Sequence, residues 1–104
     1  LAITGGSRPA ARELLTMLIG DGESLVAEIT AAVASRNAAA VREAAHALKG
    51  IAGNVGAPRL ERAARAIETC PAATSDAGLT TFVAALKEEF TTVAVRGRAF
   101  AETP

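Results

Sequence analysis

The 104-residue chain lacks tryptophan and tyrosine, carries no net charge, and contains only three phenylalanines and one cysteine. A single cysteine, Cys70, excludes an internal disulfide and a cysteine metal cluster, and it favours a reducing, cytoplasmic setting. Because the 11 basic and 11 acidic residues balance, we expect no nucleic acid or other polyanion as partner. No apolar run is long enough to span a bilayer and no signal peptide is visible, so direct membrane contact is not expected.

Alanine is what the chain has in excess, at 26 of its 104 positions. Alanine is the best helix former, and together with leucine, isoleucine and valine it predicts closely packed helices in one domain. The chain starts at Leu1 and not at a methionine, which suggests a fragment of a longer polypeptide, although a processed or engineered start is equally compatible. The predicted organisation is a linker (1–7), a helical bundle (8–97) and a C-terminal tail (98–104).

Caps and helical periodicity predict five helical segments and no strand. They run from about residue 8 to 19, from 21 to about 35, from 37 to about 53, from 58 to 70, and from about 76 to 97. The break between the first two is placed at the Gly-Asp-Gly of residues 20–22, Gly56 fits a left-handed helix end, and Gly97 ends the last helix. Because the connections are short, the predicted fold class is an all-α, antiparallel four-helix bundle with an additional N-terminal helix.

The single histidine, His46, lies in the middle of the third predicted helix. At about 100° per residue, the apolar side chains of this helix share an arc of roughly 120° on the side opposite His46. They are Val41, Ala44, Ala45, Leu48, Ile51, Ala52 and Val55. The spacing that builds the core therefore turns His46 toward solvent, where a neutral imidazole can act as a nucleophile. An exposed histidine without a function is also a common event, so its neighbours matter.

Two glycines, Gly50 and Gly53, follow His46 by about one and two helical turns on the same face. Each costs about 1 kcal/mol relative to alanine within a helix, in a chain that uses alanine freely. We interpret them as bare backbone where a partner protein reaches the imidazole. Lys49, at i+3, and Arg42, at i−4, are close enough to offset the charge of a phosphoryl group, although a solvated lysine is the ordinary alternative. The candidate catalytic pair is thus His46 and Lys49, with Arg42, Gly50 and Gly53 as docking residues.

A resemblance to histidine-containing phosphotransfer (Hpt) domains rests on residues 46–57, which are His-Ala-Leu-Lys-Gly-Ile-Ala-Gly-Asn-Val-Gly-Ala. The similarity covers roughly residues 10 to 95. It departs from the family at Leu18, near which an aromatic residue is frequent, at Asn37, where aspartate is frequent, and at Ile51, which is bulkier than usual. The resemblance implies that His46 accepts a phosphoryl group from the aspartyl phosphate of a receiver domain and passes it to the aspartate of a response regulator.

The partners implied by this resemblance are receiver domains of a hybrid sensor histidine kinase and of a response regulator. The chain has no glycine-rich phosphate loop, so we expect no kinase activity of its own, no cofactor and no metal, and we place Mg²⁺ on the receiver. The family is usually monomeric, and its parent kinase can be tethered to a membrane. Two alternatives stay open: a histidine-bearing substrate domain of an ATP-dependent kinase domain, as in chemotaxis kinases, and a non-catalytic helical adaptor.

Overall fold

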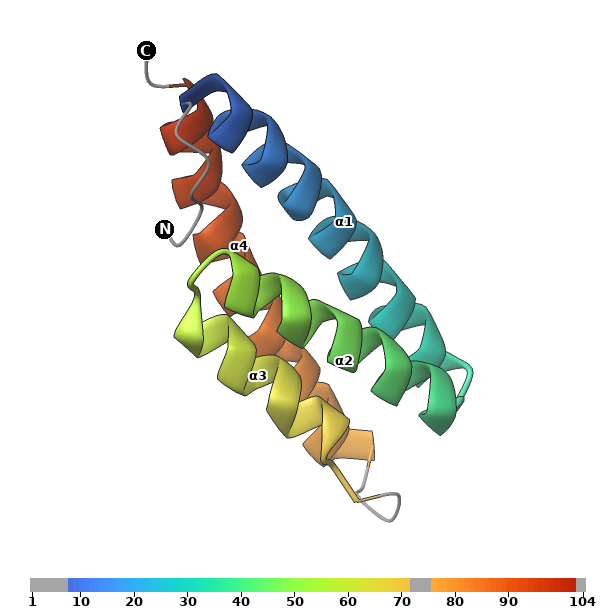
Figure 1. Cartoon of the computed structure of the whole chain (residues 1–104). Coiled ribbons are helices and arrows are strands. Elements are labelled where there is room, and N and C mark those ends of the chain that lie inside the picture. The colour runs from blue at the N-terminus through green and yellow to red at the C-terminus, as the bar shows by residue number, and fades with distance from the viewer. Residues whose placement is uncertain (1–7, 72–75, 103–104) are drawn as a thin grey trace.

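The computed structural model describes residues 8–71 and 76–102 of the chain, so the predicted linker 1–7 lies outside the described residues. The described residues form four helices and no strand: α1 (Arg8–Ala34), α2 (Ala38–Asn54), α3 (Pro58–Glu68) and α4 (Asp76–Glu102). Each helix packs antiparallel against the next, and α4 packs against α1, which closes a ring of four (Figure 1). The predicted all-α bundle is therefore confirmed. None of these helices is long and apolar enough to cross a membrane.

The predicted break at residues 20–22 is wrong, because α1 continues through it as one helix of 27 residues. The segment expected to be an additional N-terminal helix is therefore the first half of α1. The reason is packing against α4. A Cβ atom placed on Gly22 would lie 2.5 Å from Cε1 of Phe90, so this glycine makes room for an aromatic ring and does not end the helix.

The predicted end of the last helix at Gly97 is also wrong, because α4 continues to Glu102. Gly97 is buried, and a Cβ atom there would lie 2.5 Å from Cδ1 of Ile19. Like Gly22, it allows α1 and α4 to approach closely. Most of the segment predicted as a tail is therefore helical, and only residues 103–104 of it lie outside the described part of the chain.

The core lies between the four helices and is purely apolar among the described residues. Its largest fully buried side chains are Leu15, Ile29, Leu48, Leu60, Ile67 and Leu86. Three alanines are also fully buried, Ala45 and Ala52 on α2 and Ala64 on α3. The predicted core face of α2 is confirmed, with Ile51 partly buried and the other six residues of that face buried.

Two tight turns fix the position of α2. At the end of α1, Arg36 has a positive φ of 58°, and the amide of Asn37 donates to the carbonyl of Ala32 at 2.9 Å. The same arrangement ends α2, where Gly56 has a positive φ of 68°, as predicted. There the amide of Ala57 donates to the carbonyl of Ala52, also at 2.9 Å. Asn37 then caps α2, because its side-chain oxygen accepts from the amide of Ala40 at 3.1 Å.

Candidate functional site

The middle of α2 presents His46 to solvent, with 69% of its side chain exposed. Its neighbours Ala45 and Leu48 are fully buried on the core side of the same helix. The predicted orientation of His46 is therefore confirmed. A protein that docks on this face can reach the imidazole without any opening of the bundle.

One carboxylate, that of Glu68 on α3, holds both candidate catalytic side chains. Its Oε2 atom is hydrogen-bonded to Nδ1 of His46, and its Oε1 atom accepts a hydrogen bond of 2.6 Å from Nζ of Lys49. The side chains of Lys49 on α2 and Glu68 on α3 are 26% and 21% exposed, so both are half-buried. The arrangement is a triad across two helices, with the imidazole as its most exposed member.

The hydrogen bond from Lys49, and then the one from His46, hold the pKa of Glu68 below its usual range, against an opposing effect of desolvation. Glu68 is therefore ionised at neutral pH. Because a carboxylate only accepts hydrogen bonds, Nδ1 of His46 is the donor in their contact. In the neutral ring the lone pair then belongs to Nε2, to which none of the described residues is hydrogen-bonded.

The register between α2 and α3 explains why Glu68 meets His46. Gly53 follows His46 by seven residues on α2, and Glu61 precedes Glu68 by seven residues on α3. Since the helices are antiparallel, two residues seven positions apart on one face of α2 can meet two residues seven positions apart on α3. A Cβ atom on Gly53 would indeed lie 3.2 Å from Oε2 of Glu61. Sequence reasoning missed Glu68 as a site residue, although folding the helical hairpin about Ala57 would have placed it opposite His46.

The two glycines after His46 are both exposed, but they differ in what surrounds them. A Cβ atom on Gly50 would meet nothing within 4 Å, which agrees with a bare patch of backbone beside the imidazole. Gly53 instead lies against Glu61 at the border with α3. The open backbone next to His46 is thus at Gly50, and a docking role for Gly50 and Gly53 stays a prediction.

Comparison with known families identifies the chain. The model of the Hpt domain family matches residues 13–95, which include every residue of the triad. The chain belongs to the Hpt domain family. Hpt domains take part in histidine phosphotransfer within phosphorelays and interact with receiver domains. No curated protein and no solved structure matches the chain.

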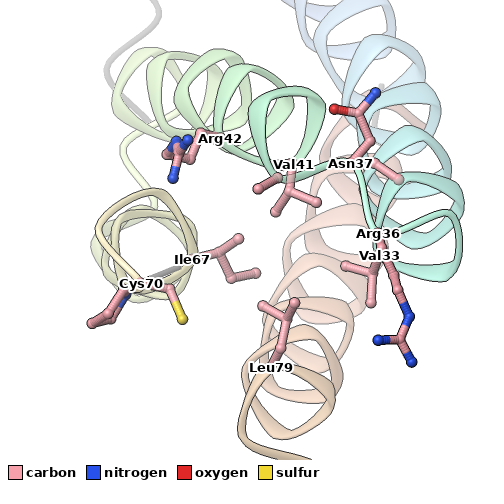
Figure 2. A pocket seen from close by; sticks show the side chains of 11 residues that line it. Val33, Arg36, Asn37, Val41, Arg42, Ile67, Cys70 and Leu79 are labelled. Carbon is pink, nitrogen blue, oxygen red and sulfur yellow. The ribbon is translucent and has the colours of Figure 1, made fainter. Parts of the chain in front are cut away.

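In this Hpt domain, Arg42 lies one turn before His46 but borders a different feature. It stands at the rim of a cavity of about 290 Å³ near the α1–α2 turn (Figure 2). Val41, Ile67 and Leu79 supply apolar walls, and neither His46 nor Glu68 lines the cavity. The cavity is therefore separate from the triad, and a docking role for Arg42 stays a prediction.

The described part of this Hpt domain contains no group of three or more histidine, cysteine, aspartate or glutamate side chains that could hold a metal ion. The triad itself offers one carboxylate, and both of its oxygens are occupied by Lys49 and His46. What the triad can do chemically is present a nucleophilic nitrogen beside a positive charge. The expected Mg²⁺ on the receiver remains a prediction.

Proposed function

We propose that this Hpt domain is a phosphorelay intermediate that accepts a phosphoryl group on His46 from the aspartyl phosphate of one receiver domain and passes it to the aspartate of a response regulator. The observation that carries the proposal is that a chain of this family has one histidine, and that its imidazole projects into solvent from the middle of α2. A buried imidazole would be shielded from any aspartyl phosphate.

In the proposed reaction, Nε2 of His46 attacks phosphorus and the bond between phosphorus and the aspartyl oxygen breaks. Phosphoryl transfer depends mainly on positioning and on charge neutralisation. The ammonium group of Lys49, at i+3, supplies positive charge on this side, and Mg²⁺ held by the acidic residues of the receiver would supply it on the other. The chain itself needs no nucleotide site and no kinase activity.

The proposed partners approach over Gly50, with Arg42 and Gly53 at the sides of the docking surface. We place the domain in the cytoplasm, where receivers are phosphorylated, as a part of a hybrid sensor kinase that is monomeric when isolated. Receivers carry an acidic pocket, and the positive charges of Arg42 and Lys49 are complementary to it.

The test is incubation with a phosphorylated receiver. The wild type should take up label, and His46→Gln should not. Lys49→Ala should fold as the wild type does but accept the phosphoryl group more slowly or lose it sooner. Equal labelling of the wild type and His46→Gln would show that the assignment of His46 is wrong.

The same experiment separates the two alternatives. A mixture that offers both a phosphorylated receiver and an ATP-loaded kinase domain should label His46 from the receiver. Labelling only from the kinase domain would instead identify a substrate domain of a chemotaxis-type kinase. A wild-type chain that takes up label from neither donor would be a helical adaptor.

A further inference from the structure

The placement of Glu68 is unusual for the helix that carries it. Glu68 is the last residue of α3, where the backbone carbonyls give the helix end a partial negative charge. A carboxylate is disfavoured at that end of a helix and a cation is favoured. The stability of α3 alone therefore does not account for a glutamate here. Its two partners on α2, His46 and Lys49, do.

Phosphorylation of His46 changes the charge of the ring to which Glu68 is hydrogen-bonded. When Nε2 of the neutral ring attacks phosphorus, the electron pair of the breaking P–O bond leaves with the aspartate. The ring then carries the phosphoryl group on Nε2 and the original proton on Nδ1, so it is positively charged. A hydrogen bond to a charged form favours that form, and the carboxylate of Glu68 already accepts from Nδ1.

The proton on Nδ1 decides how well the ring gives up the phosphoryl group. In the second transfer, a carboxylate oxygen of the acceptor attacks phosphorus and the electron pair of the P–N bond returns to Nε2. With the proton present, the ring leaves as neutral imidazole. Without it, the ring would have to leave as an imidazolate anion, which is a far poorer leaving group.

We propose that Glu68 is a positioning residue that keeps the proton on Nδ1 of phosphorylated His46 and thereby keeps the phosphoryl group transferable to the next aspartate. This role rests on the proposed function, because Glu68 acts only through a phosphorylated His46. It extends that function by assigning a residue to the donor half of the relay.

Other charges also act on the ring, but none of them is bonded to Nδ1. Arg42, Glu43 and Lys49 lie within a turn of His46 on α2, and Arg65 lies within a turn of Glu68 on α3. Glu28 of α1 lines the same pocket as Glu43. The three cations disfavour a further positive charge on the ring, whereas the two glutamates favour it. Because Glu68 is the one residue hydrogen-bonded to Nδ1 within residues 8–71 and 76–102, its removal should dominate the response to pH.

The experiment compares Glu68→Gln with a matched control, Glu61→Gln, which removes the same charge from the same helix two turns away. Phosphoramidate, a small donor, loads each protein, and transfer from the phosphorylated protein to an unphosphorylated receiver is timed from about pH 6 to about pH 8, where histidine changes charge. We expect Glu68→Gln to transfer about tenfold more slowly at the upper end and as fast as wild type at the lower end. Glu61→Gln should follow the wild type throughout, and Glu68→Asp should be intermediate.

Nitrogen-15 NMR of the phosphorylated ring gives a second readout that a merely structural role would not move. The wild type should keep the proton on Nδ1 to higher pH than Glu68→Gln does. If wild type and Glu68→Gln have superimposable pH profiles and NMR titrations, Glu68 does not hold the proton on Nδ1. The proposed function would still stand in that case, provided that His46→Gln fails to take up label. Uptake of label by His46→Gln would instead overturn the proposed function itself.

Discussion

Replacing Gly50 should make this Hpt domain more stable and a poorer phosphotransfer partner at the same time. Gly50 lies within α2, is exposed, and offers open space to a Cβ atom, with nothing within 4 Å. Alanine there should raise the free energy of unfolding by about 1 kcal/mol and glutamine by slightly less, because both are better helix formers than glycine. For a domain of this size, 1 kcal/mol corresponds to a rise in Tm of about 4 °C.

The effect on transfer has the opposite sign if Gly50 is where the receiver approaches His46. A glutamine side chain at this position should slow phosphoryl transfer from a receiver about tenfold, which corresponds to a loss of about 1.4 kcal/mol in the encounter complex. Thermal unfolding followed by circular dichroism measures the first effect, and the initial rate of labelling measures the second.

The matched control is Gly20→Gln on α1, where a Cβ atom also meets nothing within 4 Å. It should stabilise the fold by a similar amount and leave the labelling rate unchanged. A Gly50→Gln protein that is more stable and transfers at the wild-type rate would refute the steric reasoning. A Gly50→Ala protein that is not stabilised would refute the reasoning about the helix.

Three further predictions concern stability. Gly22→Ala should destabilise the fold by about 1–3 kcal/mol in thermal unfolding, because the new methyl group would displace the ring of Phe90; unchanged stability would show that the ring shifts freely. Arg36→Gly should raise the free energy of unfolding, measured in urea, by about 1 kcal/mol, because it relieves the left-handed backbone at φ 58°; a lower free energy of unfolding would contradict this. The pKa of Glu68 is lowered from its ordinary value of 4.5 by the hydrogen bonds from Lys49 and His46. Glu68 should therefore contribute stability that is present above pH 4.5 and is lost as pH falls through the lowered pKa. Urea unfolding of Glu68→Gln should lack that part of the acid response, and an identical pH dependence would refute it.

The helical fold and the exposure of His46 could be predicted because both depend on local periodicity. The core face of α2 follows from the spacing of its apolar residues, and the side opposite that face contains His46 whatever the other helices do. The end of α2 was also predictable, since a left-handed stop at Gly56 is a property of the backbone itself.

What the sequence could not show depends on contacts between helices. Gly22 and Gly97 are of a residue type that often ends helices, but here they allow α1 and α4 to approach closely. Their contact partners, Phe90 and Ile19, lie far away in the chain. Glu68 was missed for the same reason. Its role arises from the antiparallel register with α2, and the residues of α3 alone do not reveal its partners.

The buried alanines of α2 and α3 have a consequence for the chemistry of the domain. Ala45, Ala52 and Ala64 have no exposed surface, and small buried side chains allow two helices to approach closely. The hydrogen bonds that Glu68 accepts from the other helix survive displacements of only a few tenths of an ångström. A valine or leucine in place of one of these alanines would act as a wedge, and could break the triad while the protein remained folded. The volume of the buried side chains in this bundle therefore bears on the reactivity of His46 as well as on stability.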